Sequence, residues 1–299
     1  MKTTMLTSFD GYKLCINEYS SPNPIGVVQI AHGMEEHQGR YKDFATFLTK
    51  NGFIVVSADM RGHGKTADKL GFFAKKDGAK ALIKDQQTVL EYIKATYGNL
   101  PVYLFAHSMG TIISRNVLKT DSSAYKKVVL SGFPCYNKAT PMGIALANTI
   151  CFFAGTAHKS KMLEKMCLGS FNKQITDHKT DFDWLSFNEK NVKNYIDDPL
   201  CGFGFCCSAF RDLLTLVKGM HSAKNTQNIK SSLPILLISG DADPCTGGED
   251  GRADSLNALK QQGFKNIKLT TISHARHEIL NEENKTETYN KILKFLQSK

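Results

Sequence analysis

The chain has 299 residues, of which 41% are hydrophobic and 22% charged, and its formal net charge at pH 7 is +10. This composition is that of a globular protein and excludes a disordered, collagen-like or coiled-coil chain. The length suits either two domains or one large α/β domain, with a core that needs no metal or disulfide to hold it. The positive charge is spread without a basic stripe or a nucleic-acid-binding motif, so no nucleic-acid partner is expected.

The N-terminal residues contain no apolar run of the kind that forms a secretory signal. Eight cysteines fall at irregular positions without a CxxC pair. They predict reduced thiols, a cytoplasmic location and no metal site, because zinc ligands usually come in closely spaced pairs. The most apolar stretch, residues 142–155, is too short to cross a membrane.

The first half of the chain alternates between strand-like and helix-like segments. Apolar runs predict strands at 14–19, 26–31, 53–58, 102–106 and 127–131, and amphipathic patterns predict helices at 41–50, 77–97 and 109–119. Alternation returns near the C-terminus, with strands at 235–239 and 267–272 and helices at 252–262 and 283–297. Strands that are apolar throughout and alternate with helices predict a mostly parallel sheet covered by helices on both faces.

Between these two parts, residues 135–228 show helix-like stretches and no clear strand. We therefore expect an α/β fold whose core is formed by residues 1–134 and 229–299. The intervening segment, 135–228, is expected to form an inserted helical cap or lid.

The strongest local signal surrounds Ser108. A buried strand ends at Ala106, a helix begins after Ser108, and the small residues Ala106 and Gly110 flank the serine two positions away on each side. This is the context of a nucleophile elbow, in which a sharp strand-to-helix turn presents a serine hydroxyl at the edge of the sheet. The usual elbow has glycine in place of Ala106, so one extra methyl group must fit against the neighbouring strand.

A serine nucleophile needs a histidine base and a carboxylate that orients it, and in this fold they follow in the order serine, acid, histidine. The loop after the strand at 235–239 contains Asp241 and Asp243, and the loop after the strand at 267–272 contains His274 and His277. Both loops follow the carboxyl ends of strands, where α/β sheets carry their sites. The residues alone leave two acids and two histidines open.

An oxyanion intermediate needs two backbone N–H donors. The residue after the serine, Met109, is expected to supply one, and Met34, in the loop after the strand at 26–31, the other. His32 is expected to brace that loop. The stretch 59–66 ends in Gly-Lys-Thr but has Asp59 where a phosphate-binding loop requires glycine, so no nucleotide cofactor is predicted.

Together these motifs resemble the α/β-hydrolase superfamily and, more narrowly, its monoglyceride lipase and lysophospholipase branch, grouped with serine aminopeptidases of the S33 type. The matching stretches are 32–41, 59–64, 107–110, 240–243 and 275–278. The resemblance implies Ser108, Asp243 and His277 as the catalytic residues and Met34 and Met109 as the oxyanion donors. It implies no metal and no organic cofactor.

The lid segment suggests the substrate. It is rich in aromatic residues, and the candidates for lining an acyl site are Phe152, Phe153, Trp184, Phe203 and Phe205. Apolar surface beside a site indicates an acyl tunnel or peripheral membrane contact through the lid.

We therefore expect a serine esterase that acts on a single-acyl-chain lipid, either a monoacylglycerol or a lysophospholipid. Two alternatives stay open: an aminopeptidase, which would need an acidic pocket built from lid carboxylates, and a non-catalytic ligand-binding protein on the same fold.

Overall fold

The computed structural model describes residues 1–226 and 229–298. Its centre is an eight-stranded sheet in the order β1-β2-β4-β3-β5-β6-β7-β8. β2 is antiparallel to both of its neighbours, and every pairing from β4 across to β8 is parallel. The strands are β1 (Lys2–Thr7), β2 (Lys13–Tyr19), β3 (Gly26–Ala31), β4 (Phe53–Ala58), β5 (Val102–His107), β6 (Tyr125–Ser131), β7 (Ile235–Gly240) and β8 (Ile267–Ile272).

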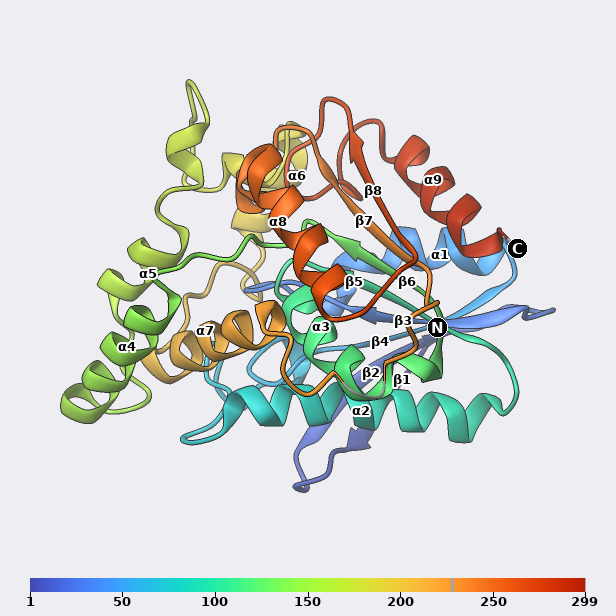
Figure 1. The fold of residues 1–299 in the computed structure, drawn as a ribbon, viewed down its shortest axis with the longest axis horizontal. Coiled ribbons are helices and arrows are strands. Elements are labelled where there is room, and N and C mark those ends of the chain that lie inside the picture. The colour runs from blue at the N-terminus through green and yellow to red at the C-terminus, as the bar shows by residue number, and fades with distance from the viewer. Residues whose placement is uncertain (227–228, 299) are drawn as a thin grey trace.

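Helices cover both faces of this sheet (Figure 1). Neighbouring residues of a strand, such as Leu104 and Phe105, belong to two separate hydrophobic cores on opposite faces. This explains why the central strands are apolar throughout, and it confirms the predicted α/β fold. One core includes α2 (Gly78–Tyr97), α3 (Met109–Asp121) and α8 (Gly248–Gln261), and the other includes α1 (Lys42–Lys50) and α9 (Lys285–Gln297).

Between β6 and β7, the described residues form four α-helices: α4 (Thr140–Ala154), α5 (Lys161–Leu168), α6 (Glu189–Asp197) and α7 (Cys207–His221). We call this segment the helical insertion. In Figure 1, α4, α5 and α7 lie beside the sheet, and α7 packs against both α3 and α4. The end predicted for the insertion, residue 228, lies outside the described residues.

The predicted strands and helices are present, but the sequence analysis missed β1. None of its six residues is buried, because β1 is an edge strand paired on one side only. Its three threonines therefore give no hydrophobic pattern. Among the described residues, no helix combines the length and the apolar character that crossing a membrane requires.

Candidate active site

Ser108 occupies a strained turn between the end of β5 and the start of α3. Its backbone has φ 51° and ψ −120°, in the positive-φ region that residues other than glycine rarely adopt. The Ser108 N–H donates to the carbonyl oxygen of Ser131 at 2.9 Å, and the Ser108 carbonyl accepts from the Thr111 hydroxyl at 2.7 Å. Strain of about 1–3 kcal/mol persists only where the surroundings fix the backbone in this way.

The small residues beside Ser108 allow β5 and α3 to approach β3 closely. Ala106 is fully buried and pairs in register with Ala31, whose own side chain is small, so the additional methyl group is accommodated. A β-carbon on Gly110 would lie 2.3 Å from the carbonyl oxygen of Ala31. Glycine is therefore required at Gly110 by the backbone of β3.

We expect Gly110→Ala to lower the free energy of unfolding by about 1–3 kcal/mol, as overpacking does, because a strand carbonyl cannot move aside. Chemical denaturation measures this loss. Gly143→Ala is the matched control, since Gly143 is also helical but its β-carbon would meet the flexible ends of Leu214 and Met166, at 3.0 and 3.2 Å. Equal losses in both variants would contradict the close-approach argument.

Asp243 and His277 form a buried hydrogen-bonded pair at the carboxyl ends of β7 and β8. The Nδ1 atom of His277 lies 3.0 and 3.1 Å from the two carboxylate oxygens of Asp243. The His277 side chain is 2% exposed and the Asp243 side chain 0%. Burial disfavours the charged imidazolium, but the Asp243 carboxylate outweighs burial and raises the pKa of His277 above its usual value.

The other acid and histidine of these loops have different contacts. The Asp241 carboxylate accepts from the backbone N–H groups of His274 and Ala275, at 3.1 and 3.3 Å, and so ties the two loops together. The His274 ring stacks on Phe187 with centroids 4.3 Å apart. Asp241 and His274 are both exposed, in contrast to Asp243 and His277.

Ser108 and His277 line one cavity of about 910 Å³, together with Met34, Met109 and Trp184. The Trp184 ring lies 4.9 Å from the His277 ring. The apolar wall is supplied by α3 and by the helical insertion, through Ile112, Met166, Phe171, Phe182, Leu213, Leu214 and Val217. Two of the three implied catalytic residues, Ser108 and His277, therefore face a largely apolar space, and Asp243 contacts His277 without lining the cavity.

Of the five aromatic residues expected to line the acyl site, the structure brings only Trp184 to this cavity. Phe152 and Phe153 are 82% and 81% exposed at the end of α4. Phe203 and Phe205 pack instead around the buried His63 ring, each with centroids 5.4 Å from it. The sequence could not distinguish these positions, because all four lie in similarly apolar stretches.

Hydrogen bonds from neighbouring buried residues hold the loop that contains Met34 in place. As predicted, His32 is a structural residue: its Nδ1 donates to the Gly33 carbonyl, and its Nε2 accepts from the Met60 N–H, both at 2.8 Å. The Glu36 carboxylate accepts from the Gly33 N–H and from the Tyr41 hydroxyl. The two bonds of Gly33 fix the backbone just before Met34, and the Met60 and Tyr41 bonds hold the His32 and Glu36 side chains in place.

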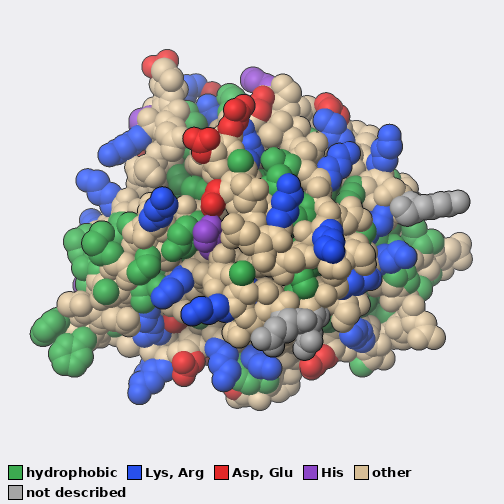
Figure 2. Space-filling view, in the orientation of Figure 1, with side chains coloured by type: hydrophobic (Ala, Val, Ile, Leu, Met, Phe, Trp, Pro, Cys, Tyr) green, Lys and Arg blue, Asp and Glu red, His purple; other side chains and the backbone are tan. Residues whose placement is uncertain are grey.

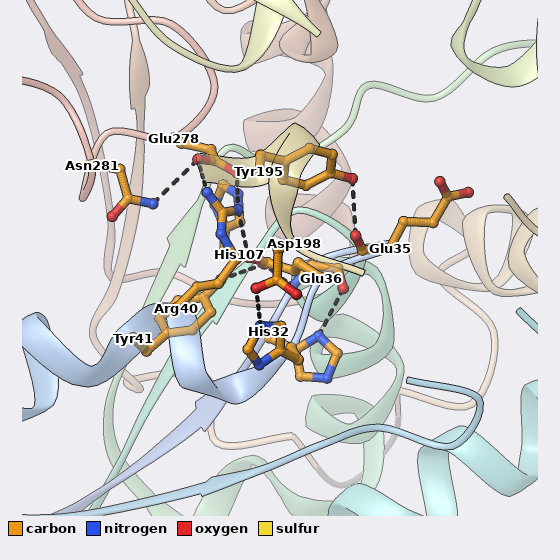
Figure 3. Close-up of polar contacts among 12 residues, drawn as sticks. His32, Glu35, Glu36, Arg40, Tyr41, His107, Tyr195, Asp198, Glu278 and Asn281 are labelled. Carbon is orange, nitrogen blue, oxygen red and sulfur yellow. Dashed lines mark hydrogen bonds and ion pairs between the residues drawn. The ribbon is translucent and has the colours of Figure 1, made fainter. Parts of the chain in front are cut away.

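A second buried network, not identified from the sequence, joins the loop that contains Met34 to the loop that contains His277 and to the helical insertion (Figure 3). Arg40 donates to Glu36 at 3.1 Å and binds both carboxylate oxygens of Glu278. Asn191 of α6 donates to Glu278 at 2.7 Å. Burial opposes ionisation, but Arg40 lowers the pKa of Glu278 to about 2.

His107, directly before Ser108, lies in one of the matching stretches, but the sequence analysis gave it no role. It is buried, and its ring centroid lies 4.7 Å from that of His277. Burial and the neighbouring His277 lower the pKa of His107 to about 4, so this ring is neutral near pH 7. Its place before the serine was the available signal, but contact with His277 depends on the fold.

Two groups of described side chains come close enough to share a metal ion: Asp243, Cys245 and His277, and His37, Asp198 and Cys201. In each group the histidine is already hydrogen-bonded to the carboxylate, at 3.0 Å in the first and 2.9 Å in the second. In both groups the histidine and the carboxylate are thus accounted for as hydrogen-bonded pairs.

The fold and the site together define an α/β-hydrolase. A family model described as "Serine aminopeptidase, S33" matches residues 22–284. The chain belongs to this family, and it is a serine ester hydrolase. The resemblance drawn from the motifs is therefore confirmed.

Relatives similar in sequence carry the names of the same branch. The chain is 28% identical over 247 residues to the monoglyceride lipase of Mus musculus, an alignment that covers 80% of this chain and 72% of the mouse protein. It is 26% identical over 266 residues to the monoacylglycerol lipase of Mycolicibacterium smegmatis, covering 87% and 84%. A carboxyl esterase from Bacillus coagulans shares the fold with a TM-score of 0.91 at 24% identity, covering 99% and 97%.

Proposed function

We propose that the chain hydrolyses the ester of single-acyl-chain lipids, monoacylglycerols or lysophospholipids, with Ser108 as nucleophile, His277 as base and Asp243 as the acid that orients it. The observation that carries this proposal is the buried Asp243–His277 pair, whose His277 lines one largely apolar cavity together with the strained Ser108. The lipase relatives support the substrate class.

In the proposed reaction, the Ser108 hydroxyl attacks the ester carbonyl while Nε2 of His277 takes its proton. Asp243 holds Nδ1–H of the ring and stabilises the imidazolium. The backbone N–H groups of Met34 and Met109 bind the oxyanion. His277 then protonates the leaving alcohol, and water hydrolyses the acyl-enzyme with the same ring as base. The proposed steps use no metal and no organic cofactor.

A matched substrate panel tests the proposal: monooleoylglycerol, oleoyl-lysophosphatidylcholine, a short-chain nitrophenyl ester and an aminoacyl naphthylamide, with Ser108→Ala as the blank. We expect rapid release of oleate from at least one lipid, and the ratio of the two rates identifies the head group. Turnover of the short ester alone would contradict the acyl-site proposal. Cleavage of the amide would favour the aminopeptidase. No turnover of any of the four compounds would favour the non-catalytic ligand-binding protein.

We also propose that the helical insertion, residues 135–228 in the sequence division, acts as a lid that contacts membranes peripherally. Figure 2 shows apolar side chains gathered at the edge of the molecule formed by α4 and α5, with lysines around them. The exposed apolar residues there are Met142, Phe152, Phe153, Met162 and Met166, and the exposed lysines nearby are Lys159, Lys161 and Lys165. Apolar groups ringed by cations suit an anionic bilayer surface.

Replacing both Phe152 and Phe153 with serine should reduce binding to anionic vesicles by on the order of tenfold or more, because two exposed rings no longer enter the bilayer. Hydrolysis of a soluble short-chain ester should be unchanged. Vesicle co-sedimentation and the ester assay measure the two effects. Phe9→Ser is the matched control, since Phe9 is 55% exposed in the turn between β1 and β2. Unaltered vesicle binding by the double variant would contradict the proposal that the helical insertion contacts membranes.

A cytoplasmic location remains part of the proposal. Its support is that all eight cysteines are free thiols in the structure.

A further inference from the structure

Two cysteines meet where the ends of two helices of the insertion come together. Cys151 lies in the last turn of α4 and Cys207 is the first residue of α7. Their sulfur atoms are 3.0 Å apart, although 56 positions separate them in the chain. A disulfide bond would shorten this separation to about 2.05 Å. The adjacent Cys206 does not share the contact, since its sulfur faces the Ser208 hydroxyl at 3.3 Å.

The backbone around this contact is held in place by hydrogen bonds between the start of α7 and the loop that follows α4. The Cys207 N–H donates to the His158 carbonyl at 2.7 Å, and the Ser208 N–H donates to the Thr156 carbonyl at 3.2 Å. Lys159 and Cys206 form an isolated β-bridge in the same place. The two sulfur atoms are therefore kept together by the fold, independently of any bond between them.

We propose that Cys151 and Cys207 are a modification site, an oxidisable dithiol that forms a disulfide linking the end of α4 to the start of α7. Low-molecular-weight disulfides of the glutathione class are the oxidant. Cys151, the more exposed of the two at 9%, attacks the oxidant as thiolate and releases one thiol. Cys207 then attacks the mixed disulfide and releases the second. Two S–H bonds are lost and one S–S bond forms, while the oxidant takes up two electrons and two protons.

The surroundings make this exchange slow near neutral pH. Burial and the Cys207 sulfur raise the pKa of Cys151 to about 12, so the attacking thiolate is scarce. In a reducing compartment the pair therefore stays reduced unless oxidant persists. Once formed, the bond would enclose the chain from Phe152 to Cys206, which includes Trp184 and the exposed pair Phe152 and Phe153. Oxidation would restrain the segment that forms one wall of the cavity.

The test equilibrates the full chain with oxidised and reduced glutathione at pH 8.5, alkylates the remaining thiols and maps the peptides by mass spectrometry. We expect one linkage, between Cys151 and Cys207, with six thiols alkylated and the other two lost. The oxidised protein should also melt at a higher temperature than the reduced protein. Cys151→Ser and Cys207→Ser should abolish both effects.

Cys206→Ser is the matched control, because it removes the neighbouring thiol of the same dipeptide and should leave the linkage and the melting shift intact. Should Cys207→Ser fail to fold, Cys151→Ser still decides the question. Absence of a linkage in the wild-type chain under oxidised glutathione would overturn the proposal, as would a linkage through Cys206. Persistence of the melting shift in Cys151→Ser would overturn it as well.

Discussion

Ser108→Ala should reduce ester turnover by a factor on the order of 10⁴ to 10⁶, because the substitution removes the hydroxyl proposed to form the acyl-enzyme. The substitution removes one oxygen from a side chain whose backbone is held by Ser131 and Thr111, so folding should be unaffected. Steady-state kinetics on the preferred ester measures the loss, and a fluorophosphonate probe reports the nucleophile directly.

The labelling experiment separates a working nucleophile from a structural serine. Wild-type protein should label once per chain, and Ser108→Ala not at all. Ser131→Ala, a change at the end of the neighbouring strand, serves as a control that should still label, because the bond to Ser108 uses the Ser131 carbonyl and not its side chain. Labelling that survives in Ser108→Ala would place the nucleophile elsewhere.

Asp243→Asn should lower turnover by about 10⁴-fold, since the amide no longer holds the His277 ring in the tautomer that accepts the serine proton. His277→Ala should lower it at least as far. The matched variants Asp241→Asn and His274→Ala change the exposed acid and the exposed histidine of the same two loops. These two residues are joined by a hydrogen bond from the His274 N–H to the Asp241 carboxylate. They should retain most of the activity, and a large loss in them with little in Asp243→Asn would reverse the assignment.

The pH profile gives a second readout of the same pair. A general base must be unprotonated, so activity should fall as the pH drops through the pKa of His277. The Asp243 carboxylate raises that pKa, and its removal in Asp243→Asn should move the acidic limb of the residual activity to lower pH. The kcat/KM of both proteins across the pH range measures the shift. An acidic limb that does not move would mean that Asp243 does not set the ionisation of His277.

The sequence predicted the parts of the molecule in which local pattern and burial agree. The apolar strands of the central sheet and the small residues around Ser108 are such parts, because each has to satisfy a constraint set by its own neighbours in the chain. The edge strand β1 escaped prediction since it buries no side chain. The choice between Asp241 and Asp243 was likewise beyond local pattern, and it was the family resemblance that separated them.

Contacts between distant segments were beyond the reach of the sequence. Arg40 and Glu278 are 238 positions apart, and nothing in either stretch indicates that they meet. The aromatic residues of the helical insertion illustrate the same limit: Phe152, Phe153, Trp184 and Phe205 are all large and apolar, yet one pair faces solvent, Trp184 lies beside His277 and Phe205 is buried against His63. Hydrophobicity favours the burial of such residues, but it does not specify which part of the protein they pack against.

By itself, then, the sequence determined the α/β class, the strand–turn–helix at Ser108 and the chain order of the candidate serine, acid and base, because periodicity and turn chemistry are local properties. The tertiary structure alone decided which side chains enclose the cavity, which loops Arg40 ties together, and that the thiols of Cys151 and Cys207 touch. Those contacts depend on how the insertion packs against the sheet, and packing between segments far apart in the chain leaves no trace in either segment alone.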